Sequence, residues 1–325
     1  MEPLTASISP SENDFSACSG CSLCLLPCPV WRQKRDITFT WQGRARALQQ
    51  GAAKEDLRES IFACAYCGSC DPICPQGIDL RGNMAQLRGN DENNPFAKEI
   101  CIRIEEALKK PVNPGKKAHT LLVIGDNDQR IEKIRSLLSG KTTVEPASDK
   151  GRDIVLAIEA GLEIPEERLE AFINPLKKAK EIIVSNGILK RPLKHLLPGL
   201  KVRGLGQVLS SLPQIRSKLK PTDFYIIESR AYNWDLQSMV VYYDKLRRET
   251  GAIFNLDLNR IAIPTTATSI QQISGIKGIN AAEQVKWLLE GREVKRIVVE
   301  SVDDGEAFSA SVDIPVIHLS DLGEV

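Results

Sequence analysis

Two copies of one cysteine pattern constrain this chain more than any other feature of its sequence. The spacing of both copies is C-x2-C-x2-C-x3-C, and a proline follows the last cysteine directly. The first copy comprises Cys18, Cys21, Cys24 and Cys28. The second copy comprises Cys64, Cys67, Cys70 and Cys74. Thiols clustered in this way, early in a longer chain, indicate a metal centre.

The C-x2-C-x2-C-x3-C-P run is typical of bacterial two-cluster ferredoxins, in which the fourth cysteine of each run binds the other cluster. Small residues such as Gly20 and Gly68 allow backbone amides to approach the sulfides. The pattern therefore predicts two [4Fe–4S] clusters. We assign the first cluster to Cys18, Cys21, Cys24 and Cys74. We assign the second cluster to Cys64, Cys67, Cys70 and Cys28.

Zinc and disulfides are the alternatives for these eight thiols. Structural zinc takes two separated pairs of ligands, and four thiols within eleven residues would be crowded. A disulfide scaffold would spread its bridges, whereas about 220 residues after Cys101 contain no cysteine. We expect Cys101 to be a small buried hydrophobe. Tyr66 lies between two predicted ligands, where it would shield a cluster from water or pack as a half-buried aromatic.

Composition excludes several classes of function. The chain has 43 Lys and Arg against 42 Asp and Glu, so no large basic surface for nucleic acid is expected. The sequence contains no apolar run of about 18 residues, the length that a membrane-spanning helix needs. Residues 1–10 lack the features of a secretory signal. We therefore expect a cytoplasmic protein without a transmembrane segment.

The pattern of apolar residues changes near residue 110, and the two patterns together predict an α+β multidomain protein. Residues 1–110 are expected to form a helical, ferredoxin-type dicluster domain, with helices over residues 43–61 and 95–110. A linker rich in Pro, Gly and Lys covers residues 111–118. Two similar α/β halves are predicted at residues 119–215 and 222–325, because short β-branched runs alternate there with helical patterns.

The first hundred residues resemble the dicluster domain of heterodisulfide reductase subunits C and D and of glycolate oxidase iron–sulfur subunits. The segment WQGRARAL at residues 41–48 resembles the Gly-Arg helix of that family. The segment CPQGID at residues 74–79 resembles the end of its second motif. The resemblance implies a mostly helical domain that is often followed by two cysteine-rich CCG repeats.

The rest of the chain resembles CCG repeats that have lost their cysteines. Ser229 stands where the family carries a cysteine, and residues 263–267 stand near the Cys-Cys-Gly position. Residues 301–304 and 185–188 stand where Cys-x-x-Cys is expected. Because a thiolate site cannot exist without thiols, the resemblance implies a protein that keeps the electron relay and lacks the catalytic cluster.

These observations predict an electron-transfer subunit with no catalytic residues of its own. Its expected partners are redox subunits, namely a flavoprotein or heterodisulfide reductase-like subunits, and a quinone-linked acceptor would place it at a membrane through a partner. One alternative is a catalytic iron–sulfur subunit that reduces a disulfide or oxidises a 2-hydroxy acid. The other is an iron–sulfur redox sensor.

Overall fold

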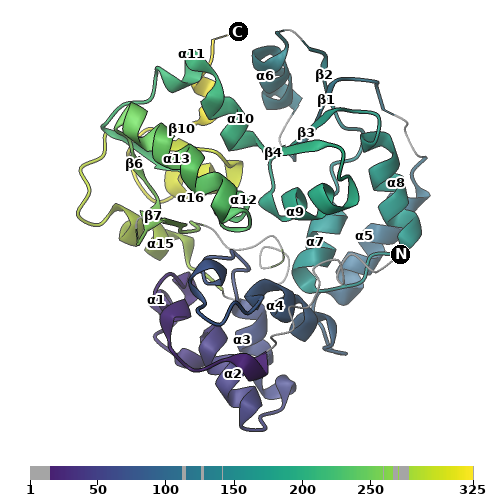
Figure 1. The fold of residues 1–325 in the computed structure, drawn as a ribbon, viewed down its shortest axis with the longest axis vertical. Helices are drawn as coiled ribbons and strands as arrows, with labels where there is room; N and C mark the ends of the chain where they lie inside the picture. The colour runs from purple at the N-terminus through teal and green to yellow at the C-terminus, as the bar shows by residue number, and fades with distance from the viewer. Residues whose placement is uncertain are drawn as a thin grey trace.

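The computed structural model describes residues 15–111, 115–125, 128–140, 142–258, 260–265, 270 and 278–324. Figure 1 shows a purple and blue N-terminal lobe at the bottom, with a teal lobe and a green to yellow lobe above it. Among the residues described, no helix is both long and apolar enough to span a bilayer. The architecture is mixed α/β with parallel sheets.

The N-terminal lobe is built from short helices and, over residues 15–111, contains no strand. Its α-helices are α1 (Pro29–Lys34), α2 (Trp41–Gln49), α3 (Arg58–Ala63), α4 (Leu80–Gly89) and α5 (Ala97–Lys109). Its 3-10 turns are η1 (Phe15–Ala17), η2 (Leu23–Leu25), η3 (Ile37–Phe39), η4 (Lys54–Leu57) and η5 (Asp71–Ile73). The single helix predicted over residues 43–61 is wrong, because α2 ends before Gly51, whose φ of 85° is left-handed.

The first α/β lobe contains a four-stranded parallel sheet in the order β2-β1-β3-β4. Its strands are β1 (Thr120–Val123), β2 (Val144–Pro146), β3 (Glu181–Val184) and β4 (Lys201–Gly204). Its helices are α6 (Asp128–Leu138), α7 (Arg152–Ala160), α8 (Glu166–Leu176), α9 (Gly187–Leu196), α10 (Leu205–Ser211) and α11 (Pro213–Arg216). All four residues of β1 are buried, as a central parallel strand requires.

The second α/β lobe contains another four-stranded parallel sheet, in the order β10-β9-β5-β6. Its strands are β5 (Asp223–Ile226), β6 (Ile253–Phe254), β9 (Arg296–Val299) and β10 (Val316–His318). A separate antiparallel pair is formed by β7 (Leu256–Asp257) and β8 (Ile261–Ala262). The helical elements are α12 (Ser229–Asn233), α13 (Leu236–Thr250), α15 (Ala281–Leu289), α16 (Val302–Ser309) and η6 (Leu319–Leu322).

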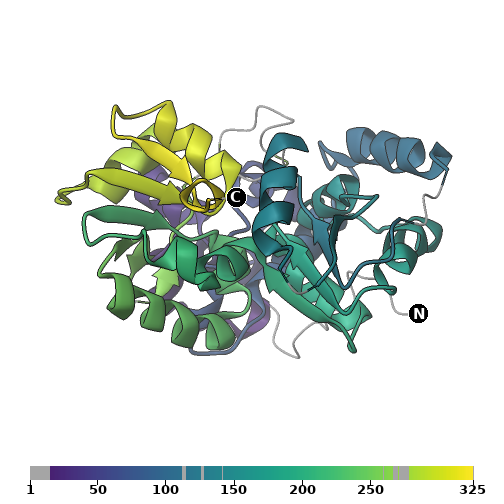
Figure 2. The same ribbon diagram turned by 90° about the horizontal axis from the view of Figure 1, so that it is seen from above.

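The prediction of parallel α/β sheets after residue 119 is therefore confirmed. In both sheets the strand that comes first in the chain pairs with the second and the third, and the fourth lies beyond the third. Seen from above, the two sheets lie side by side with the N-terminal lobe behind them (Figure 2). That the two halves are similar, CCG-like units stays a prediction, as do the predicted domain limits.

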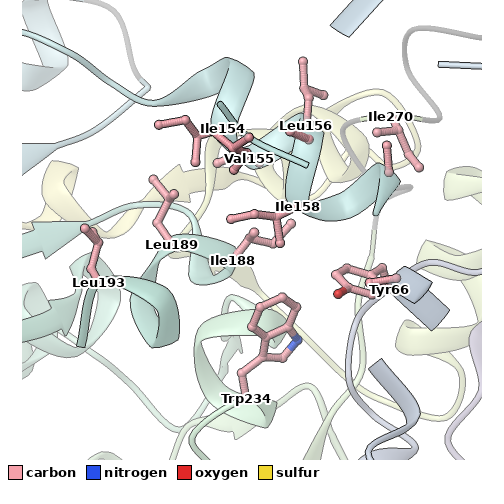
Figure 3. Packing of buried hydrophobic residues seen from close by; sticks show 14 of the residues in the cluster. Tyr66, Ile154, Val155, Leu156, Ile158, Ile188, Leu189, Leu193, Trp234 and Ile270 are labelled. Carbon is pink, nitrogen blue, oxygen red and sulfur yellow. The ribbon is translucent and has the colours of Figure 1, made fainter. Parts of the chain in front are cut away.

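The N-terminal lobe shares its hydrophobic core with the first α/β lobe. Helix α5 packs against α7 and α8, and Ile100 and Ile104 of α5 join the cluster that contains Ile154 and Ile158 of α7. Tyr66 of the second cysteine motif faces this cluster (Figure 3). The cysteine motifs thus rest against the α/β lobes and are not carried on a separate body.

At two places where the lobes meet, a glycine lets the backbones of two elements pack directly against each other. A Cβ atom on Gly89 of α4 would lie 2.1 Å from the carbonyl oxygen of Gly161, the residue that ends α7. A Cβ atom on Gly187 of α9 would lie 2.0 Å from the amide nitrogen of Ala231 in α12. Glycine is required at both positions because any side chain would drive the packed elements apart.

Candidate iron–sulfur site

The two cysteine loops have the same backbone conformation at corresponding positions. In the first loop Gly20 and Ser22 have left-handed φ angles of 79° and 66°. In the second loop Tyr66 and Gly68 occupy the same places, with φ angles of 50° and 72°. Left-handed residues on both sides of the second cysteine turn the chain back on itself. Each loop can therefore direct its first three sulfurs toward a common centre, as the spacing predicted.

Helix α2 holds the first cysteine loop in place. The Gln49 side-chain amide donates to the carbonyl oxygens of Phe15 (2.9 Å) and Cys18 (3.0 Å). The Gln42 amide donates to the Gly20 carbonyl oxygen at 3.1 Å. Thr40 caps the start of α2 by accepting from the Gly43 amide at 3.1 Å. The segment at residues 41–48, singled out in the sequence, is thus the support of the first loop.

Several of the eight thiols lie close enough to act on one another electrostatically. Burial raises the pKa of Cys24 to about 11, and smaller contributions in the same direction come from Cys18, Cys21 and Cys74. Cys74 of the second motif thus lies near Cys24 of the first. The assignment of these four cysteines to one cluster stays a prediction.

Cys28 interacts in turn with the second motif. Burial raises the pKa of Cys67 to about 12, with further contributions from Cys64 and Cys28. Burial also raises the pKa of Cys70 well above its ordinary value, and its neighbours include Cys67, Cys64 and Cys24. Because Cys24 belongs to the first motif and Cys70 to the second, the two cysteine loops lie next to each other. All eight sulfurs are free of disulfides.

A cavity of about 40 Å³ lies between the two loops. Five of the cysteines line it, namely Cys24, Cys28, Cys64, Cys67 and Cys70. Apolar side chains, including Val30, Trp41 and Met84, form much of the remaining wall, and Arg44, Arg81 and Ser69 also line it. Soft sulfur donors in an apolar, buried setting fit iron–sulfur clusters. No three His, Cys, Asp or Glu side chains in the described ranges converge on a single metal ion.

Two buried arginines place positive charge beside the thiols. Arg44 is 2% exposed and donates to the hydroxyl (2.8 Å) and carbonyl (2.6 Å) oxygens of Ser60. Its charge acts on Cys28 and lowers the pKa of that thiol against the larger effect of burial. Arg88 is fully buried and donates to the Cys64 carbonyl oxygen at 2.7 Å. These cations favour thiolates at the site.

The second α/β lobe covers the second cysteine loop. The Trp234 ring meets the Tyr66 ring edge-on, with 5.4 Å between the centroids, and Figure 3 shows both side chains at the rim of the shared core. Tyr66 is 2% exposed, so it is a buried packing residue next to the cysteines. Asn233 donates to the Cys67 carbonyl oxygen at 3.3 Å. Neither Asn233 nor Trp234 carries a local sequence signal that points to the cysteines.

Positions that the resemblance equated with lost cysteines carry small polar or acidic residues. Ser301 follows β9 and caps α16 by accepting from the Asp304 amide at 3.4 Å. Asn186 follows β3 and caps α9, accepting from the Ile188 amide at 3.0 Å. Asp304 is buried, which raises its pKa to about 7. Ser229 begins α12, Thr265 is buried, and residues 266 and 267 lie outside the described residues.

Cys101 does not match its expectation. The residue lies on α5 as predicted, but its side chain is exposed. The buried face of α5 is formed by Ile100 and Ile104, and Cys101 lies one residue beyond that stripe. The expectation of a buried Cys101 is therefore wrong.

Comparison with known proteins agrees with the character of this site. Residues 14–78 match the model of the 4Fe-4S dicluster domain family, so the N-terminal part of the chain carries a dicluster domain. A probable glycolate oxidase iron-sulfur subunit of Bacillus subtilis is 30% identical over 73 residues, which are 21% of this chain and 16% of that protein.

A fumarate reductase iron-sulfur subunit of Mycobacterium tuberculosis is 30% identical over 93 residues, 24% of this chain and 38% of the relative. The chain thus spans only a minor part of either relative. No solved structure matches. These similarities associate the chain with iron–sulfur subunits of oxidoreductases and with electron transfer. The heterodisulfide reductase-like and CCG-type resemblances stay predictions.

Proposed function

We propose that this protein is the electron-transfer subunit of a larger oxidoreductase and relays single electrons through two [4Fe–4S] clusters. The observation that carries the proposal is the pair of complete cysteine motifs, whose loops lie next to each other in the fold. When bound, each cluster accepts and releases one electron. The protein's own residues hold the clusters, exclude water and supply compensating charge.

The proposed ligands of the first cluster are Cys18, Cys21, Cys24 and Cys74, and those of the second are Cys64, Cys67, Cys70 and Cys28. The interactions of Cys24 with Cys74 and of Cys67 with Cys28 support this crossed arrangement. Crossed ligation makes the clusters neighbours, because each loop then contributes to both. A pair of neighbouring clusters is suited to a short electron relay.

The proposed partners are redox subunits, with a flavoprotein or a heterodisulfide reductase-like subunit on one side and a second acceptor on the other. Support comes from the relatives, both of which are iron–sulfur subunits by name. We further propose that the two α/β lobes are a pair of CCG-type units without cysteines. Their common strand order supports this. Free thiols at the site favour a reducing compartment such as the cytoplasm.

Anaerobic purification followed by iron and sulfide analysis tests the proposal. We expect about eight iron and eight sulfide per chain, because two cubanes hold that number. Cys74→Ser is expected to remove the spectroscopic signal of one cluster and Cys28→Ser that of the other. Cys101→Ser is the matched control, since this exposed thiol lies outside both sets, and it should keep both signals.

Reductive titration distinguishes the alternatives. An electron-transfer subunit takes up two electrons per chain and passes them to an added acceptor, without turning over a substrate when alone. Turnover of a disulfide or a 2-hydroxy acid by the isolated chain would instead identify a catalytic subunit. A colourless preparation that contains zinc and no iron would refute the proposal as a whole.

A further inference from the structure

The two cysteine loops differ in what covers them. Leu23 and Ser69 occupy the same place in the two motifs, between the second and third cysteines. Leu23 is 41% exposed, whereas Ser69 is 1% exposed. The first loop meets solvent at this position, and the second meets residues of α12 and β8. A difference of this kind gives the two predicted clusters different surroundings.

Ser69 connects the second loop to the second α/β lobe through a compact hydrogen-bond network. Its hydroxyl oxygen lies 3.2 Å from the Cys67 sulfur and 3.1 Å from the carbonyl oxygen of Ala262. The Asn233 amide nitrogen lies 3.1 Å from the same hydroxyl oxygen and 2.8 Å from the Ala262 carbonyl oxygen. The Asn233 carbonyl oxygen accepts from the Ala262 amide at 3.1 Å, which fixes the orientation of the side chain.

The number of protons in this network determines where the serine hydroxyl points. Ser69 has one proton, for which the Cys67 sulfur and the Ala262 carbonyl oxygen compete. The Asn233 amide has two protons and three acceptors in reach, the oxygens of Ala262 (2.8 Å), Ser69 (3.1 Å) and Cys67 (3.3 Å). The two shorter contacts take both protons, so the Ser69 oxygen accepts one and the Ala262 carbonyl oxygen has a donor. The Ser69 proton can then go to the Cys67 sulfur.

We propose that Asn233 is a positioning residue that directs the Ser69 hydroxyl at the Cys67 sulfur and thereby raises the reduction potential of the second cluster alone. This inference rests on the proposed function, because it assumes a cluster bound through Cys67. A hydrogen bond to a ligating sulfur stabilises the more negative, one-electron-reduced form of a cluster. The first loop lacks an equivalent, since leucine at the position of Ser69 has no proton to donate.

Trp234 keeps the second loop in the position that this bond requires. A Cβ atom on Gly68 would lie 2.6 Å from Cδ1 of Trp234, so the indole lies directly against the loop backbone. The guanidinium carbon of Arg81 lies 4.6 Å from the centroid of the same ring, and Arg81 is ion-paired with Asp71. The end of α12 therefore holds the loop at Gly68, through Trp234, and at Ser69, through Asn233.

The test is a redox titration of the anaerobic holoprotein, followed by electron paramagnetic resonance so that both clusters are observed separately. Ser69→Ala and Asn233→Ala should each lower the affinity of the second cluster for an electron by about tenfold, ~59 mV for one electron. The potential of the first cluster should not change. In the Ser69→Ala background, Asn233→Ala should add less than half of its effect in the wild type, because Asn233 acts through the hydroxyl.

Asn233→Asp provides a second variant, should Asn233→Ala fail to fold. It keeps the acceptor for the Ala262 amide and attracts the Ser69 proton away from the sulfur, so it should lower the potential at least as far. Asn255→Ala is the matched control, because Asn255 is also buried and bonded to backbone at Ile227 and Ile263 without touching the cysteines.

The outcomes separate this inference from the proposed function. Two reducible clusters whose potentials do not move in any Ser69 or Asn233 variant would overturn the inference and leave the electron relay intact. An equal shift in Asn255→Ala would also overturn it, since general loosening would then explain the effect. A protein without two reducible clusters would refute the proposed function itself.

Discussion

Replacing Arg88 by methionine is expected to destabilise the folded protein by about 3–5 kcal/mol. The guanidinium is fully buried between the N-terminal lobe and the first α/β lobe. It donates to the carbonyl oxygens of Glu159 (2.6 Å), Cys64 (2.7 Å) and Ile61 (3.1 Å). Methionine keeps the packing of the stem and removes every one of these bonds.

The magnitude follows from what the substitution leaves behind. Hydrogen bonds from a charged donor contribute about 1.5–3 kcal/mol each, and three buried acceptors lose their partner. The methionine variant no longer has to bury a cation, and burial is the main reason that the pKa of Arg88 is lowered. This saving offsets part of the loss and brings the estimate down to the range given.

Thermal unfolding of the anaerobic holoprotein, recorded by circular dichroism at one scan rate, measures the effect. We expect Arg88→Met to lower the apparent Tm by about 5–10 °C. Arg88→Lys should fall between this variant and the wild type, because one ammonium cannot reach three separated carbonyls. Arg103→Met is the control, since its ion pair with Glu99 is exposed and should contribute less than about 1 kcal/mol. An Arg88→Met protein that melts within about 2 °C of the wild type would refute the reasoning.

Three further predictions test other parts of the structure. Gly68→Ala is expected to lower the free energy of unfolding by about 2–4 kcal/mol, because alanine there is strained by the left-handed backbone and also clashes with Trp234. Gly77→Ala has open space around it and should cost only the backbone strain, about 1–2 kcal/mol. Melting curves of the two variants, recorded side by side, measure the difference. Burial lowers the pKa of His318 to about 4, so the unfolded chain binds a proton more readily and stability falls as the pH drops below 6.5. Between pH 7 and 5 the loss should be about 2 kcal/mol, and His318→Asn should flatten this part of the stability profile; an unchanged slope would contradict it. Thr40→Ala removes the cap of α2 and should cost about 1 kcal/mol in unfolding experiments, with a loss under 0.3 kcal/mol counting against the capping role.

The sequence was most informative where chemistry and spacing coincide. Eight cysteines in two identical runs predict the kind of group that the family model of the dicluster domain also indicates, whereas the division of the thiols between two clusters stays a prediction. The strands at residues 121, 182, 224 and 297 were also recognised, because buried parallel strands read as short β-branched runs. Short edge strands such as β4 and β10 were missed, since three or four half-polar residues carry no periodic signal.

Contacts between distant segments were the part that the sequence did not predict. Asn233 bonds to the Cys67 loop across 166 residues of chain, and nothing local distinguishes it from a surface asparagine. Arg44 and Arg88 carry no sequence signal of burial, yet both are buried and donate to carbonyl oxygens of other segments. Cys101 was predicted to be buried and is exposed, because one residue further along a helix is enough to move a side chain from the core to solvent.

The residues that support the two cysteine loops are synthesised at different times. The supports of the first loop, Gln42 and Gln49, leave the ribosome shortly after the loop itself. The second loop depends on Asn233 and Trp234, which emerge only when most of the chain has been made. The second loop of a nascent chain therefore lacks these contacts until 166 residues have followed Cys67.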